Sequence, residues 1–380
     1  MTRFVLALAC VAAAATALAV ATPLPAAGTA WRVTPVASGL DSPRGLAVAD
    51  NGALYVAEGG HGGDVCQRPG FCIGTTSRIS RVDVATGTRT TVVGGLYSRM
   101  VASEGITGAN GLAARGGRLL ATVTSFPEEL AGWSCAGGPA DCPAVLAAAR
   151  AQAGRLISFT PSGAWQPVAN VGSNDLAWAG AHPSFSREPA NANPYGIFVL
   201  PSATLVADAG ANTLDVVAAN GAAMVASALA PPPRGGFPAD TVPTCVTVSR
   251  GNAFVGSLSG KLWKRAGSFT PTEVPVPDGL LHHVTGCTSD AKGDIFLVDM
   301  WSTPGPPIPA GPGSAAGTGS VVQVTADGTA SVLAQGLMFP NGIALARDGS
   351  LYVSIGSTCT AQGTPFPYCA SGGGVVKLSR

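Results

Sequence analysis

Short runs of alternating hydrophobic and polar residues recur along the chain, separated by turns that contain glycine. Alternation with a period of two predicts half-buried β-strands. The segments 36–60 and 333–357 align without gaps at an offset of 297 residues, with twelve identities in 25 positions. A match of this length at a fixed offset indicates that the chain is built from an internal repeat.

The repeated unit predicts four short strands, which we call A to D in chain order. Six units are found, and their first two strands lie at 43–58, 109–123, 194–210, 243–257, 285–299 and 340–354. The sixth unit ends after its third strand, and residues 31–40 fit the missing fourth. Such repeats, closed into a ring, are typical of β-propellers. We therefore expect an all-β, six-bladed β-propeller of four-stranded antiparallel blades over residues 31–380, with the last blade closed by the N-terminal strand.

Loop lengths divide the expected propeller into two unlike faces. The A–B and C–D turns are short, whereas the B–C loops and the links from strand D to the next strand A carry the insertions 59–77, 126–153, 173–193, 230–241, 301–318 and 357–373. A short helix is expected at about 144–153, and 173–193 and 230–241 are expected to be linking loops. Function in propellers usually lies on loops held by a rigid scaffold, so we expect the site on this insertion face and at the channel mouth.

Polar residues recur at two repeat positions next to that mouth. Strand B ends with an acid in three units, at Glu58, Asp208 and Asp299, and strand A begins with Asn110 and Asn341 in two others. Carboxylate and amide oxygens are ligands for hard cations, which makes Ca²⁺ the candidate cofactor. The alternative is that each acid accepts backbone N–H bonds from its own loop.

The N-terminus predicts export. One arginine precedes an apolar, alanine-rich run that is followed by small residues, the pattern of a signal peptide over residues 1–30. The alternative is a retained membrane anchor, although no other segment resembles a membrane span. We expect a secreted, periplasmic or cell-surface protein.

Eight cysteines remain after such a leader is removed, and an even number in an exported chain predicts disulfides. Three pairs lie within single B–C loops: Cys66–Cys72, Cys135–Cys142 and Cys359–Cys369. The remaining two, Cys245 and Cys287, are assigned the same position in strand A of neighbouring blades, which predicts a bond around the channel or, alternatively, two buried free thiols. Zinc is a competing interpretation, but the chain contains no Cys-x-x-Cys.

Composition and sequence motifs restrict the classes of function that the chain can have. Charged residues make up 11% of the chain and the net charge is +1, which argues against a nucleic-acid partner. There is no G-x-S-x-G, H-E-x-x-H, P-loop or EF-hand motif. His282 and His283 precede the fifth strand A, where one of them is a candidate general base. These observations favour a protein without catalytic residues, whose partner is a protein or a small molecule.

The chain resembles the ScyD/ScyE family of exported bacterial propellers with NHL-like repeats. The resemblance rests on GLDSPRGLAVADNGALYVAE at 39–58, NANPYGIFVLPSATLVADAGANTLDVVAANG at 191–221 and VPTCVTVSRGNAFVGSLSG at 242–260. It departs at Ser257, where such proteins tend to have an acid. The resemblance implies a secreted binding or scaffold propeller. Pro340-Asn341-Gly342 also looks like a segment of gluconolactonase-type propellers in which the asparagine binds a metal, so a metal-dependent hydrolase or lactonase is the alternative.

Overall fold

The predicted strands form six antiparallel sheets in the described part of the chain. The structure is a computed structural model that describes residues 31–101, 105–234, 237–303, 305–307, 314–362 and 369–380. Residues 31–380 form one compact unit, and the expected signal peptide over 1–30 lies outside the described residues. In this part of the chain no helix is both long and apolar enough to cross a membrane.

The first three blades follow one another along the chain. Blade 1 contains β2 (Pro43–Val48), β3 (Leu54–Glu58), β5 (Phe71–Val82) and β6 (Arg89–Val101), with β4 (Val65–Arg68) and β7 (Gly105–Thr107) added to it. Blade 2 contains β8 (Ala109–Arg115), β9 (Arg118–Val123), β10 (Arg155–Phe159) and β11 (Trp165–Asn170). Blade 3 contains β12 (Pro194–Val199), β13 (Ala203–Asp208), β14 (Thr213–Ala218) and β15 (Ala223–Ala228).

The last three blades repeat the pattern, and the sixth takes its outer strand from the start of the chain. Blade 4 contains β16 (Pro243–Ser249), β17 (Asn252–Ser257), β18 (Lys261–Arg265) and β19 (Thr272–Val274). Blade 5 contains β20 (Val284–Ser289), β21 (Ile295–Asp299), β22 (Gly319–Val324) and β23 (Ala330–Leu337). Blade 6 contains β24 (Ile343–Leu345), β25 (Leu351–Ile355), β26 (Gly373–Ser379) and β1 (Arg32–Leu40).

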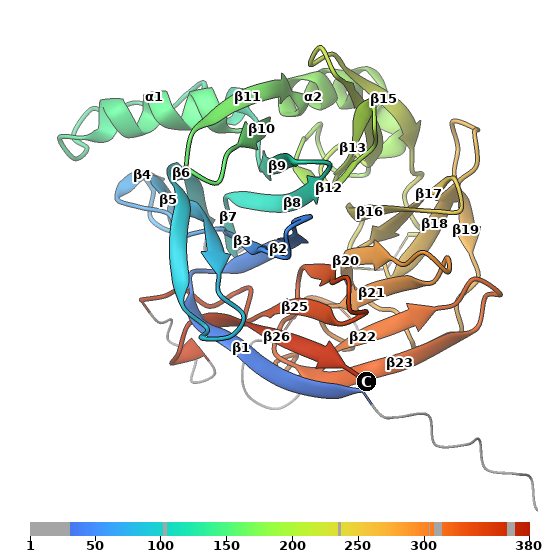
Figure 1. The fold of residues 1–380 in the computed structure, drawn as a ribbon. Helices are drawn as coiled ribbons and strands as arrows, with labels where there is room; N and C mark the ends of the chain where they lie inside the picture. The colour runs from blue at the N-terminus through green and yellow to red at the C-terminus, as the bar shows by residue number, and fades with distance from the viewer. Residues whose placement is uncertain (1–30, 102–104, 235–236, 304, 308–313, 363–368) are drawn as a thin grey trace, which may run out of the picture. The chain divides into compact units, whose positions relative to one another are not determined.

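The ring closes as the sequence predicts. Strand β1 pairs antiparallel with β26, with Val33 opposite Leu378. Each innermost strand contacts the innermost strands of both neighbouring blades, from β2 and β8 around to β24 and β2. These strands lie nearest the centre of the ring in Figure 1. The six-bladed propeller closed by the N-terminal strand is therefore confirmed.

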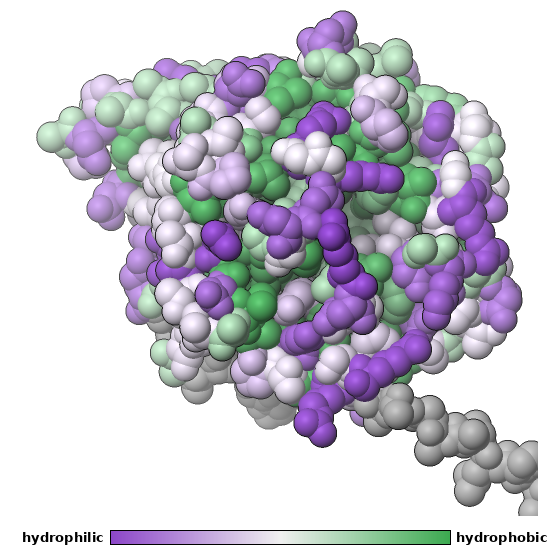
Figure 2. Space-filling view, viewed as in Figure 1, coloured by the Kyte–Doolittle hydropathy of each residue, from purple (hydrophilic) through white to green (hydrophobic). Residues whose placement is uncertain are grey.

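Hydrophobic side chains from neighbouring blades form the core. Between blades 6 and 1, Leu40, Leu46 and Val375 are at most 5% exposed and pack in one cluster. A four-stranded sheet cannot bury both of its faces alone, so each blade depends on its neighbours. On the side of the molecule seen in Figure 2, hydrophobic residues are interspersed with hydrophilic ones.

The glycine of the P-x-G segment has a packing role at the centre of the ring. A Cβ atom on Gly111 would lie 2.2 Å from the carbonyl oxygen of Tyr195 in the next blade, and one on Gly342 would lie 2.4 Å from that of Arg44. Only a residue without a side chain lets the backbones of neighbouring innermost strands approach this closely. In these blades the glycine thus lets the starts of neighbouring innermost strands meet at the channel.

Two insertions contain more secondary structure than the sequence predicts. The segment 59–77 was expected to be a loop, but it contains β4 and the first part of β5. The segment 173–193 was expected to be a linking loop, but it contains most of helix α2 (Val171–Ala181) and a short 3-10 helix, η2 (Pro183–Phe185). The side chain of Asn170 accepts a bond from the Ser173 N–H and caps α2. The helix expected at about 144–153 is present as α1 (Cys142–Gln152), beside the 3-10 helix η1 (Pro127–Leu130).

Candidate functional site

The channel is narrow at the point where the innermost strands begin. The cavity there has a volume of about 50 Å³. Its polar lining comes from the starts of the innermost strands and includes Asn110, Tyr195, Thr244, Thr285 and Asn341. A space of this size holds a few water molecules at most. The cavity is therefore too small to admit a substrate.

The side chain of Tyr195 spans the channel from blade 3 to blade 6. Its hydroxyl oxygen accepts a hydrogen bond from the Asn341 side-chain amide at 2.8 Å. The Tyr195 backbone is fixed at its other side, because its carbonyl oxygen accepts a bond from Thr122 Oγ1 at 2.8 Å and lies 3.4 Å from Asn110 Nδ2. Both asparagines predicted as metal ligands thus contact Tyr195.

The predicted acid Asp208 is occupied by its own loop. It ends β13 and is fully buried. Its Oδ1 accepts backbone N–H bonds from Asn193, Gly210 and Ala211 at 2.8–2.9 Å. Burial raises the pKa of the Asp208 carboxyl, and the three donors oppose this rise while they hold the link in place, as the structural interpretation of the sequence expects.

The predicted acid Glu58 stabilises the junction of blades 6 and 1. It is fully buried at the end of β3, where its Oε2 accepts the Asp41 N–H at 2.7 Å. The same oxygen forms ion pairs with Arg78 at 3.2 Å and Arg89 at 3.1 Å. Its charge is therefore compensated by groups of its own blade.

The predicted acid Asp299 orients the two histidines of blade 5. Its Oδ1 accepts the N–H groups of His282 and His283, and its Oδ2 lies 3.1 Å from His282 Nδ1. The hydrogen bond with Asp299 raises the pKa of His282, whereas burial lowers the pKa of His283, whose ring stacks on Trp301 at 3.9 Å. The two pKa values therefore shift in opposite directions, and a general base at one of these histidines stays a prediction.

The five predicted ligands do not come together around one point. The acids serve separate loops, and the asparagines lie in the channel. Across the described residues, no group of three or more His, Cys, Asp or Glu side chains is arranged to hold a metal ion. Ca²⁺ at the channel mouth stays a prediction.

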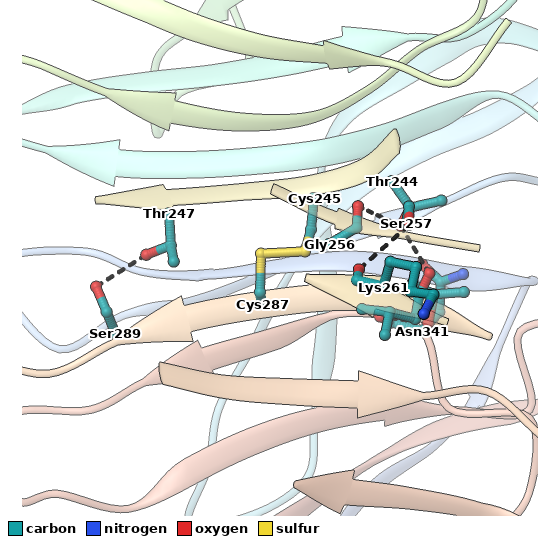
Figure 3. Close-up of a disulfide and its surroundings, with 11 residues drawn as sticks. Thr244, Cys245, Thr247, Gly256, Ser257, Lys261, Cys287, Ser289 and Asn341 are labelled. Atoms are coloured by element: carbon teal, nitrogen blue, oxygen red, sulfur yellow. Dashed lines mark hydrogen bonds between the residues drawn. A yellow bond between two sulfur atoms is a disulfide. The ribbon is translucent and has the colours of Figure 1, made fainter. Parts of the chain in front are cut away.

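The described cysteines form the four predicted disulfides, Cys66–Cys72, Cys135–Cys142, Cys245–Cys287 and Cys359–Cys369. Figure 3 shows Cys245–Cys287 joining the innermost strands β16 and β20, next to a hydrogen bond of 2.9 Å between Thr247 and Ser289. The Cys245–Cys287 disulfide joins residues 42 positions apart in the sequence. The chain-entropy model gives such a cross-link a stabilisation of up to about 4 kcal/mol.

The predicted alignment of blade 5 is wrong by one residue. The last residue of strand B pairs with Pro243 in blade 4 and with Val284 in blade 5. Thr285, and not Gly286, therefore occupies the position inside the P-x-G segment, and Cys287 lies one residue beyond the position of Cys245. Four of the six blades have proline at this position, and the marker is missing in blade 5, where Val284 replaces it.

A groove of about 630 Å³ lies on the insertion face beside blade 3. It is formed by the link that follows α2 and the link that follows β15. Its lining residues are Pro183, Ser184, Ser186, Arg187, Pro231, Pro233, Arg234 and Ala239. Both insertions were predicted from the sequence, but neither arginine was. Charged residues are sparse in this chain, so an arginine in each of these two links was the signal that could have identified the groove.

Comparisons with known proteins support the fold. No family model matches the chain, and no curated protein matches it. Among solved structures, the chain is similar to a gluconolactonase from Xanthomonas campestris (11% identity, 92% of this chain and 89% of that one, TM-score 0.52). It is also similar to a PQQ-bound aldose sugar dehydrogenase from Streptomyces coelicolor (14%, 93% and 99%, 0.52) and to a protein of unknown function from Bacteroides thetaiotaomicron (10%, 92% and 76%, 0.54). At these identities the similarity extends to the fold alone.

Proposed function

We propose that this protein is an exported, non-catalytic binding propeller that holds its ligand on the insertion face. The observation that carries the proposal is the hydrogen bond of 2.8 Å between Tyr195 and Asn341, which spans the channel and leaves about 50 Å³ beside it. Enzymes need a concave site that takes in the reacting group, and pockets for small molecules usually exceed 300 Å³ by volume. The channel is far below this range, whereas the groove of about 630 Å³ on the insertion face is large enough to hold a ligand.

The resemblance to ScyD/ScyE proteins supports the same proposal. The two most specific segments of that resemblance, 193–196 and 206–212, form the start of β12 and the end of β13 with its loop, where Asn212 donates to the Phe185 carbonyl in the link that lines the groove. Four disulfides among the described cysteines are typical of an extracellular or periplasmic protein. Export through the N-terminal leader is part of this proposal.

The groove favours a ligand that carries an acidic group. Arg187 and Arg234 line it, and its described lining contains no acidic side chain. The nearby Asp240 is buried and already accepts bonds from Ser186 Oγ and the Arg187 N–H. Arginine suits this task because its planar guanidinium can bind a carboxylate through two parallel hydrogen bonds.

We expect citrate, used as a tricarboxylate probe, to raise the melting temperature of the purified protein in a concentration-dependent way. A ligand that binds only the folded state stabilises it by mass action. Arg234→Glu should abolish this rise, because it places a negative charge in the groove. Differential scanning fluorimetry at fixed ionic strength measures the effect.

The matched control is Arg81→Glu, an exposed arginine near the end of β5, next to the C–D turn of blade 1 on the opposite face. It changes the net charge equally and should leave the response to citrate intact. A citrate response that survives Arg234→Glu, or that Arg81→Glu removes equally, would contradict the assignment of the groove. No response to citrate at all would refute the acidic ligand.

A further inference from the structure

A cleft of about 720 Å³ lies between blades 5 and 6, on the face opposite the groove. Its walls are the A–B turns of these two blades and both ends of the described chain, since Trp31 precedes β1 and Arg380 follows β26. The two ends meet because Arg32 is paired with Ser379, and Figure 1 shows the C-terminus beside the start of β1. We call this space the terminal cleft.

The terminal cleft has more basic than acidic side chains. Its charged lining residues are Lys292, Arg347, Lys377 and Arg380, together with Asp290 and Asp348. Both acids are engaged: Asp290 Oδ1 accepts two N–H groups of its own turn, and Asp348 Oδ2 lies 3.1 Å from Lys377 Nζ. Among the described residues, neither Lys292 nor Arg347 forms an ion pair. The cleft therefore offers positive charge to an anionic partner.

Trp31 gives the terminal cleft an aromatic wall. The side chain is half-buried and packs against the core cluster of blades 5 and 6, which includes Phe296 and Leu378. The guanidinium carbon of Arg380 lies 5.0 Å from the centre of its ring. Tryptophan is enriched where proteins meet the headgroups of a membrane, because its ring is apolar and its N–H is polar. An aromatic wall beside basic side chains thus suits a lipid headgroup.

Exposed hydrophobic side chains gather on the same face of the ring. The described chain has six large ones, and five of them lie in a C–D turn or within the first three residues of a strand D. These five are Val33, Val84, Met224, Phe269 and Val332. The C–D turns share one face with the A–B turns, and we call it the turn face. Single exposed hydrophobic residues are normal, but five on one face indicate a surface that meets an apolar partner.

We propose that the turn face binds the surface of an anionic phospholipid membrane, with a lipid headgroup in the terminal cleft. Lys292, Arg347 and Arg380 attract the phosphate groups. Trp31 and the five exposed hydrophobic side chains reach the boundary between the headgroups and the acyl chains. Proteins that lie on a membrane without spanning it combine basic and apolar groups in this way. The insertion face then points away from the membrane, and the inference does not rest on the ligand proposed for the groove.

A membrane accounts for both kinds of group on the turn face. A soluble polyanion would use the basic side chains but would leave Trp31 and the exposed hydrophobic residues in water. A purely apolar partner would leave Lys292 and Arg347 without a counter-charge. The position of the leader supports a membrane as well, because the segment expected to insert into the membrane during export joins the propeller at Trp31, beside the cleft.

The test is co-sedimentation of the purified protein, free of tags at both ends, with vesicles of phosphatidylcholine and phosphatidylglycerol or of phosphatidylcholine alone. We expect binding to the anionic vesicles only, and weaker binding as salt is added, because salt screens the charges. Arg347→Glu should reduce the partition coefficient at least about fivefold, the contribution of one basic residue near an anionic surface. The matched control Arg234→Glu makes the same charge change on the insertion face and should leave binding unchanged.

Fluorescence quenching tests the role of Trp31. Lipids that carry bromine on their acyl chains quench a tryptophan that reaches the membrane interface. The emission of the wild-type protein should therefore fall when brominated anionic vesicles are added. Trp31→Phe keeps an aromatic ring against the core cluster and should remove most of this decrease.

Several results would overturn the proposal. They are equal binding to neutral and anionic vesicles, no binding to either, and an Arg347→Glu variant that binds like the wild type or no worse than Arg234→Glu. Quenching that persists in Trp31→Phe would show that another surface faces the lipid. Release of the protein from the vesicles by inorganic phosphate at constant ionic strength would assign the terminal cleft to a free anion instead.

Discussion

A chain that lacks residues 31–40 is expected to lose cooperative unfolding. These residues include β1, which is the outer strand of blade 6 and pairs with β26 from the opposite end of the chain. Leu40 is fully buried with Leu46 and Val375 between blades 6 and 1. Removal of β1 opens the ring at this junction and leaves β26 as an unpaired edge strand. Thermal unfolding followed by circular dichroism and calorimetry measures the loss.

The matched control replaces β19 (Thr272–Val274) with a Gly-Ser-Gly segment. This short strand is also the outer strand of its blade, but it does not join the two ends of the chain. The variant should keep a single cooperative transition at a lower temperature. A chain without residues 31–40 that melts like the full protein would contradict the role of ring closure.

Replacement of Glu58 by alanine is expected to lower the free energy of unfolding by about 3–5 kcal/mol, the usual effect of removing one partner from a buried ionic network. Arg78, Arg89 and the Asp41 N–H would lose the carboxylate that they share. Urea unfolding of wild type and variant measures the difference.

The comparison variant for this prediction is Glu273→Ala. Glu273 pairs with Lys261 at 2.7 Å, but both side chains are nearly half exposed. Exposed ion pairs contribute at most about 1 kcal/mol, so the expected loss is much smaller. Equal losses in the two variants would show that Glu58 does not stabilise the junction of blades 6 and 1.

The fold was predictable because the strands of the six repeated units can be aligned with one another in the sequence. Strand B ends at Glu58, Asp208 and Asp299, as the apolar run before each acid indicates. The closing strand was predictable because the sixth unit lacks its fourth strand, whereas one additional strand, at residues 31–40, precedes the first unit. The alignment of blade 5 failed where Val284 replaces the marker proline, because blade 5 has one residue more than blade 4 between the paired positions of strands A and B.

The candidate site was less predictable because its contacts join residues that are far apart in the sequence. Tyr195 and Asn341 come from opposite blades, and no local pattern indicates that they meet. Arg187 and Arg234 likewise come from two different insertions, and no local pattern indicates that they line one groove.

A crystal structure of the purified protein soaked with Ca²⁺ and, for anomalous scattering, with Mn²⁺ tests most directly whether the channel is closed. We expect Tyr195 to span the channel with its hydroxyl bonded to Asn341, and no metal peak beside it. A metal ion bound by Asn110 and Asn341, with the Tyr195 side chain displaced from the channel, would contradict a binding propeller with a closed channel and support a metal-dependent hydrolase.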